Sequence, residues 1–328
     1  MKFTILNKMK PLATLILTIF TLSAFAQDIN QAGEVYNEAN QAVKAGSFET
    51  AIQKYDESIK IASQLGAEGE QIVSGAKTQI PSLYYKIGAA AYKAKKIDEA
   101  IGEFENAIKY GNDYGDAETV KKSEKIIPKL YYSKGNALYK EKKYDEALAE
   151  YKLSNQLNPN YSRALWGMGL AYGKLKNFDE MDNAFDAAMK IAEAEGDPKM
   201  AIKIKSKGKK VFQAEGAGKL QTQAWDDALK YLNTSLKYDD SDKDTYYYLA
   251  LANNGKKNWD EALKVSQKGL DLSKDENAEY KAKFYYEMGN AYKGKDMNDK
   301  ACEAYANASH GRFVESANYE LKTVLKCN

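Results

Sequence analysis

One short motif recurs along this chain and limits what the chain can fold into. It reads Lys-Lys-Tyr-Asp-Glu-Ala at 142–147 and Lys-Asn-Trp-Asp-Glu-Ala at 257–262. Close or weaker copies bring the total to seven, at 46–51, 95–100, 142–147, 176–181, 223–228, 257–262 and 296–301. Self-similarity at intervals of a few tens of residues is typical of chains built from stacked copies of one structural unit. We therefore expect a repeat architecture.

The copies align as columns of small and large residues. The last position is Ala in six copies and Met181 in the seventh, and the position twelve residues earlier is Ala or Gly in all seven. Large apolar residues such as Tyr131 and Tyr151 occupy columns between and around the small ones. Small residues at fixed helical positions let two helices approach closely, and large ones fill the space to the next pair. One unit is therefore expected to be a helical hairpin.

This pattern resembles the tetratricopeptide repeat (TPR) family, whose unit has about 34 residues. One copy carries the family's residues at the matching places: Leu165, Met168-Gly169, Tyr172, Phe185 and Ala188, with Pro159 closing the copy before it. The resemblance implies an all-α fold, a right-handed superhelix (α-solenoid) of about seven helical hairpins. The repeats would cover residues 27–309, and a capping helix and tail would cover residues 310–328.

The chain departs from the family in the length of its units. The copies are 34 residues apart from Gly135 to Gly169 and from Ala228 to Ala262, but the other intervals are 49, 47, 47 and 39 residues. Apolar residues keep helical spacing within the inserts, which predicts longer helices. Pro81 and Pro128 fall there, and each is expected to begin or kink a helix. The aspartates of five copies are expected to precede the second helix, to cap it and to favour the positive end of its dipole: Asp98, Asp145, Asp179, Asp226 and Asp260.

The first 26 residues have the layout of a secretory signal. Lys2, Lys8 and Lys10 precede an apolar run from Pro11 to Ser23, which ends at Ala24-Phe25-Ala26. A basic, then apolar, then small-residue order with an A-x-A site is typical of a cleaved signal peptide. The run is short for a membrane anchor and contains hydroxyl groups, which favours cleavage before Gln27. The mature protein is expected to be exported, periplasmic or extracellular, with no membrane span.

Composition excludes several functions. The whole chain has 48 basic and 46 acidic residues, and without the first 26 residues the balance is 45 to 46. Such an even total gives no long-range field for nucleic acid. His310 is the only histidine, so neither a histidine-based triad nor a multi-histidine metal site can form within one chain. Gly216-Ala217-Gly218-Lys219 lacks the first glycine and the Ser or Thr of a phosphate loop. We expect no enzyme activity, no metal and no cofactor.

Cys302 and Cys327 are the only cysteines. Export into an oxidising compartment would make one disulfide the natural state. The pairing requires that the last helix begin late, near Glu315 or Ser316, or that the tail fold back, because the two Cα atoms must come within about 7 Å of each other. We expect the bridge on these grounds.

The resemblance also implies where a ligand would bind. In the family, the first helix of each hairpin lines the concave groove, and the residue after the large apolar column points into it. In this chain that position is aromatic in six of seven copies, and one helical turn further three copies carry an amide. The candidate groove residues are Tyr36, Asn40, Tyr85, Tyr132, Asn136, Trp166, Tyr247, Tyr286 and Asn290. An equally acceptable interpretation is that these rings pack neighbouring helices together.

Two functions of different classes follow. The favoured one is a non-catalytic exported scaffold that holds a protein or peptide partner in the groove. The alternative is a small-ligand or glycan-binding solenoid whose aromatic side chains stack on sugar rings. The identity of a partner and the oligomeric state do not follow from the sequence.

Overall fold

A computed structural model describes residues 28–327, and these residues form helices and turns without a strand. The expected signal peptide lies outside the described residues. A first helix covers residues 28–44. The others are α2 (Phe48–Ala62), α3 (Glu70–Lys93), α4 (Ile97–Tyr114), α5 (Ala117–Lys140), α6 (Tyr144–Leu157), α7 (Ser162–Lys174), α8 (Phe178–Ala194), α9 (Pro198–Gln221), α10 (Trp225–Tyr238), α11 (Lys243–Gly255), α12 (Trp259–Leu272), α13 (Ala278–Gly294), α14 (Asn298–Ala308) and α15 (Val314–Tyr319).

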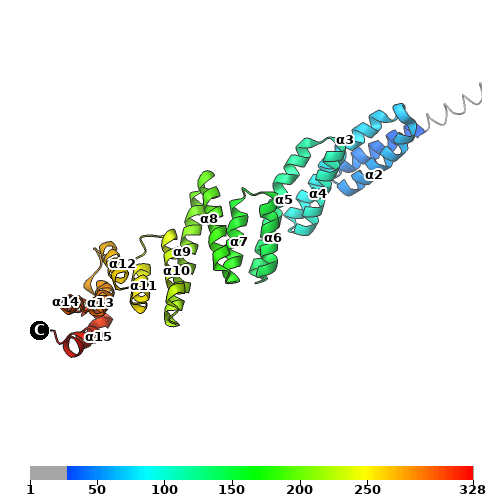
Figure 1. Ribbon diagram of the computed structural model, residues 1–328. Coiled ribbons are helices and arrows are strands. Elements are labelled where there is room, and N and C mark those ends of the chain that lie inside the picture. Colours follow the sequence, from blue (N-terminus) through cyan, green and yellow to red (C-terminus); the bar gives the residue numbers. More distant parts are fainter. Residues whose placement is uncertain (1–27, 328) are drawn as a thin grey trace, which may run out of the picture. The chain divides into compact units, whose positions relative to one another are not determined.

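The helices form seven consecutive hairpins. Figure 1 labels the helices from α2 to α15. The expected all-α fold of paired helices is confirmed. We call the helix at 28–44 and α3, α5, α7, α9, α11 and α13 the first helices, and the even-numbered helices α2 to α14 the second helices. The chain divides into two compact units between Ala171 and Tyr172, and each is described by itself.

Consecutive first helices touch within each unit. In one unit α3 contacts α5, and in the other α11 contacts both α9 and α13. The first helices α3 and α5 are therefore neighbours in one unit, and α9, α11 and α13 form a row in the other.

The inserts in the repeat lengthen helices, as the spacing predicts. The first helices α3, α5 and α9 have 24 residues each, whereas α7 and α11 have 13 each. These long helices lie within the three longest intervals between copies of the motif. Pro81 and Pro128 lie buried inside α3 and α5, so neither begins a helix. The additional length extends the start of the first helix and the end of the preceding second helix, and the turn inside each hairpin keeps its length.

The recurring motif forms that turn. Its first residue has a left-handed backbone in all seven hairpins, at Gly46, Lys95, Lys142, Lys176, Gln223, Lys257 and Asp296. In the third hairpin the Lys142 amide donates to the Tyr139 carbonyl at 3.1 Å and the Lys143 amide donates to the Leu138 carbonyl at 3.0 Å. These two bonds are those of a Schellman motif, which closes the end of a helix.

The prediction that the aspartates of this motif cap the second helix was wrong. The residue before α6 is Lys143, which makes no side-chain capping bond, and Asp145 is the second residue of the helix. The other six copies place their acid or aspartate in the same first turn. The carboxylates favour the positive end of the helix dipole from within the helix. The turn itself is closed by backbone bonds.

The column of small residues has the packing role that the alignment predicts. A Cβ atom added to Gly135 of α5 would lie 2.6 Å from the ring of Tyr151, and one added to Gly289 of α13 would lie 2.6 Å from the ring of Tyr305. Both rings belong to the second helix of the same hairpin and are fully buried. The absence of a side chain on the first helix is what admits a large ring from the second.

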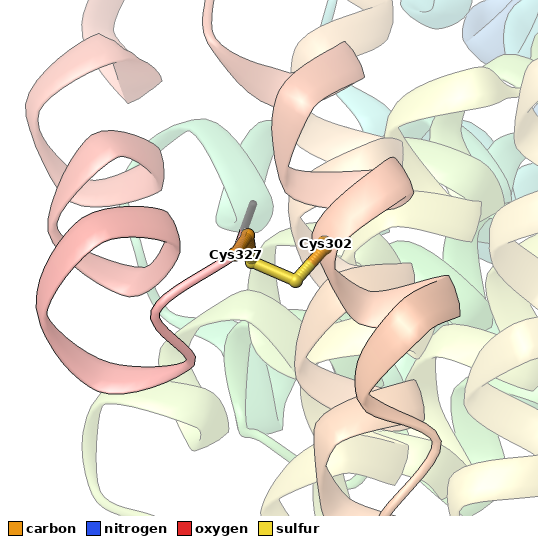
Figure 2. The surroundings of a disulfide bond; sticks show 2 residues. All are labelled: Cys302 and Cys327. Carbon is orange, nitrogen blue, oxygen red and sulfur yellow. A yellow bond between two sulfur atoms is a disulfide. The ribbon is translucent and has the colours of Figure 1, made fainter.

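A disulfide ties the C-terminal segment to the last hairpin. Cys302 of α14 is bonded to Cys327, with 5.9 Å between their Cα atoms, and Figure 2 shows the tail reaching back to α14. The segment is a short 3-10 turn, Gly311–Phe313, followed by α15 and a π-helical turn, Glu320–Val324. Ala317 is fully buried, and Leu321 and Leu325 pack on the last core cluster. None of the described helices has the length and apolar character needed to cross a membrane.

Candidate binding surface of the first helices

The nine candidate residues are all half-buried on first helices. Four of the rings lie against a buried ring of the second helix in their own hairpin. The centroid separations are 5.4 Å for Tyr36 and Tyr55, 5.3 Å for Tyr85 and Phe104, 5.7 Å for Tyr132 and Tyr151, and 5.5 Å for Tyr286 and Tyr305. Trp166 is half-buried on α7. The aromatic column thus packs the two helices of a hairpin together.

Each of the three candidate asparagines accepts a hydrogen bond from a buried tyrosine. The donors are the hydroxyls of Tyr55 to Asn40 at 2.6 Å, Tyr151 to Asn136 at 2.8 Å and Tyr305 to Asn290 at 2.8 Å. Burial raises the pKa of the Tyr151 hydroxyl and of the Tyr305 hydroxyl, so these groups stay protonated donors. Each amide oxygen therefore completes the hydrogen bonding of a core residue.

The remaining hairpins show that the two residues of this pair change together. In the second hairpin the buried ring is Phe104, which has no hydroxyl, and the position of the asparagine holds Ala89. Both positions also lack a polar pair in the fourth and fifth hairpins, where they hold Leu170 and Phe185, and Ala217 and Leu232. An amide occurs only where the second helix supplies a tyrosine fifteen residues later. This spacing was visible in the sequence and identifies the pairs as structural.

Several of the candidate rings also contact the start of the following repeat. Tyr132 lies 5.5 Å from Tyr161, Tyr247 lies 6.3 Å from Phe284 of α13, and Tyr286 lies 5.2 Å from Phe313 in the C-terminal segment. These rings therefore pack between neighbouring hairpins. The contacts account for a packing role, and a role of the same rings as ligand contacts stays a prediction.

Charge is divided between the two sets of helices. Over the described residues, the first helices carry 23 basic and 10 acidic side chains, a net charge of +13, and the second helices carry 10 basic and 23 acidic side chains, a net charge of −13. The near-neutral total of the chain conceals this division. In both units the first helices are thus the basic set, and α5 and α9 contribute most, with net charges of +4 and +6.

Some of these charges meet across hairpins. Lys134 of α5 lies 2.8 Å from Asp98 and 3.1 Å from Glu150, and Lys256 and Lys295 pair with Asp226 and Asp260. The three aspartates belong to the recurring motif and are 79 to 85% exposed. Exposed pairs of this kind contribute at most about 1 kcal/mol each, so they align neighbouring repeats more than they stabilise the fold.

One carboxyl is fully enclosed in the described chain. Glu287 of α13 is 2% exposed and accepts bonds from the amide of Asn254 at 2.7 Å and from that of Asn290 at 3.2 Å. Burial raises the pKa of Glu287, while these two donors act in the opposite direction. Its bonds link the sixth hairpin to the seventh. Among residues 28–327, no group of three or more His, Cys, Asp or Glu side chains is arranged to hold a metal ion.

Sequence profiles identify the class of the repeat. A profile described as TPR repeat matches residues 135–176, and two described as tetratricopeptide repeat match residues 162–195 and 215–277. The chain is a tetratricopeptide-repeat protein. A comparison with curated proteins finds no match.

Solved structures of the same class resemble the chain at low identity. YrrB, a TPR protein with an unusual peptide-binding site, is 19% identical, with a TM-score of 0.35 over 58% of this chain and 90% of YrrB. The P58(IPK) TPR domain is 14% identical, with a TM-score of 0.31 over 89% of this chain and 98% of that domain. A tetratricopeptide repeat protein from Parabacteroides merdae is 16% identical, with a TM-score of 0.30 over 91% of this chain and all of that protein.

Proposed function

We propose that this protein is an exported, non-catalytic scaffold that binds an acidic polypeptide on the layer formed by its first helices. The observation that carries the proposal is the division of charge, +13 on the first helices and −13 on the second. Electrostatic complementarity steers a partner to one surface and rejects partners of the wrong sign. The partner that fits a lysine-rich layer is a polypeptide with an excess of Asp and Glu.

The disulfide supports the exported part of the proposal. Disulfides form and persist in oxidising compartments, and the only two cysteines of the chain are joined to each other. The apolar run that precedes Gln27 has the layout of a secretory signal. The test is a reporter fused to the chain after the seventh copy of the recurring motif. We expect the reporter to be active outside the cytoplasm, and a cytoplasmic reporter signal would contradict export.

The binding part is tested with defined peptides. Mature protein starting at Gln27 is titrated with labelled poly-glutamate, with poly-lysine and with a neutral Gly-Ser peptide, and fluorescence anisotropy is recorded at increasing salt. We expect saturable binding of poly-glutamate only, with an affinity that falls as salt rises, because the screening length shrinks to about 8 Å at physiological ionic strength. Equal binding of poly-lysine, or no binding of poly-glutamate at low salt, would refute the proposal.

A further inference from the structure

Lysines concentrate in the first half of α9 more than anywhere else in the described chain. Between residues 198 and 210 the helix holds six lysines and no acidic residue: Lys199, Lys203, Lys205, Lys207, Lys209 and Lys210. Lys209 alone is neutralised, because it lies 2.9 Å from Asp242 and 3.3 Å from Asp239. The other five make no ion pair within 4 Å among the described residues. Their charges are available to a partner.

The helix arranges these lysines in two rows. Lys199, Lys203, Lys207 and Lys210 are spaced by four, four and three residues, so they follow one side of α9. Lys205 and Lys209 are four residues apart and follow another side. Ile202 lies on the ridge between the rows and is 66% exposed. An exposed isoleucine flanked on both sides by ammonium groups is suited to a ligand that is both apolar and acidic.

A hollow beside this ridge offers space for a side chain. It has a volume of about 670 Å³ and lies between α9 and the end of α10, two helices that pack side by side. Ile202, Leu236 and Tyr238 supply its apolar wall, and Lys205 supplies an ammonium group. Lys209 and Lys237 also line it, but both are already paired, Lys237 with Asp182 and Asp186. Asp239 and Asp240 close one end, where Asp239 already accepts bonds from Ser241 at 2.7 and 3.2 Å.

Burial and, after it, like charge both disfavour an ammonium group in the lysine row. Burial, together with the neighbouring ammonium groups of Lys174 and Lys210, lowers the pKa of Lys207. All three residues belong to the same unit. A carboxylate that approached this row would relieve the repulsion, which favours an anionic ligand at this place.

We infer that the first half of α9 is the main docking site of the proposed scaffold, and that it takes an acidic peptide segment with an apolar side chain between its carboxylates. The inference rests on the proposed function and names where the acidic partner binds. Carboxylates would pair with the row of four lysines and with Lys205, and the apolar side chain would cover Ile202 and enter the hollow. Such a side chain distinguishes a peptide from a nucleic acid or polyphosphate, which would leave Ile202 exposed. The row also lacks the aromatic residues on which bases stack.

The test compares two variants of the mature protein with the same loss of charge. In the first, Lys199, Lys203, Lys205 and Lys210 are replaced by Gln. In the control, four lysines of the long first helix α5 are replaced by Gln: Lys121, Lys122, Lys125 and Lys129. A third variant, Ile202→Ser, removes only the apolar ridge. The probes are a labelled Glu-rich peptide with interspersed Leu, poly-glutamate, and inorganic polyphosphate as a competitor. Far-ultraviolet circular dichroism verifies that each variant is folded.

The α9 variant is expected to bind the Glu-Leu peptide about 30-fold more weakly and with a smaller salt dependence, because four exposed charge pairs are lost. The α5 control should lose less than about threefold. Ile202→Ser should weaken binding of the Glu-Leu peptide and leave poly-glutamate binding unchanged. Equal losses in the α5 and α9 variants would overturn the α9 site but leave the proposed function standing. Failure of the unmodified protein to bind either acidic peptide would refute both, and preferential binding of polyphosphate would overturn the peptide assignment.

Discussion

The bond between Tyr151 and Asn136 can be tested by a double-mutant cycle whose end point already exists in the chain. Replacing Tyr151 by Phe and Asn136 by Ala reproduces the Phe104 and Ala89 pair of the second hairpin. The cycle compares Tyr151→Phe, Asn136→Ala and the double variant. It measures how much of the stability of the third hairpin depends on the two side chains acting together.

The expected magnitudes follow from burial. The Tyr151 ring is 1% exposed, and its hydroxyl donates to Asn136 at 2.8 Å. Asn136→Ala should cost about 1 to 3 kcal/mol, because it leaves a buried hydroxyl without its acceptor. Tyr151→Phe should cost about 1 kcal/mol, because half-buried Asn136 can turn its amide oxygen to water. The double variant should cost less than the sum of the two by about 1 kcal/mol.

Hydrogen exchange is the suitable measurement, because repeat arrays open locally and a single unfolding free energy does not describe them. Protection of the amides in α5 and α6 would be followed by mass spectrometry for all four proteins, with α11 and α12 as an internal reference. Costs of the single variants that simply add would refute the argument that the pair acts as one unit. Unchanged protection in Asn136→Ala, combined with weaker peptide binding, would make Asn136 a ligand contact.

Four further substitutions test other parts of the fold. Lys142→Gly should stabilise the third hairpin by about 0.5 to 1 kcal/mol, because glycine tolerates the left-handed turn at φ 64°. Gly46→Ala should destabilise the first hairpin for the same reason. Hydrogen exchange measures both effects. Cys302→Ser should weaken the last hairpin by about 3.5 kcal/mol, since the bridge closes a loop with a sequence separation of 25, and unreduced native protein should show no reactive thiol. Burial raises the pKa of Glu287, so the folded state holds its proton more tightly than the unfolded chain and stability falls as pH rises through the folded-state pKa. Glu287→Gln should flatten that fall in urea titrations between acidic and neutral pH, and an unchanged slope would contradict it.

The sequence predicts the helices well and their turns poorly, for physical reasons. The columns of Ala, Gly and aromatic residues are a direct consequence of helix packing, so they reveal the hairpins and the lengthened helices. The turn was misassigned because Asp145 has the side chain of a capping residue, whereas the turn is closed by backbone bonds around Lys142, a residue type that rarely adopts a left-handed conformation. Residue preference therefore pointed to the wrong position.

The candidate site shows a different limit. The asparagines were selected because one helical turn separates Asn136 from Tyr132, but the bond that occupies Asn136 comes from Tyr151 on the other helix. Reading one helix at a time could not show it, whereas comparing columns fifteen residues apart would have done so. The division of charge was hidden for a similar reason. A total of 45 basic and 46 acidic groups after the first 26 residues cancels unless the helix boundaries are assigned first.

That division is difficult to explain by stability alone. The pairs that cross between hairpins, such as Lys134 with Asp98, lie at exposed positions where each contributes little. Lysines crowded along α9 repel one another, and the pKa of Lys207 is lowered by burial first and by the neighbouring Lys174 and Lys210 second. A chain selected only to fold would gain by mixing the two signs on every helix. Because screening limits such charges to about 8 Å at physiological ionic strength, the basic layer acts only on a molecule in contact with it, and this favours a partner that carries the opposite charge along its length.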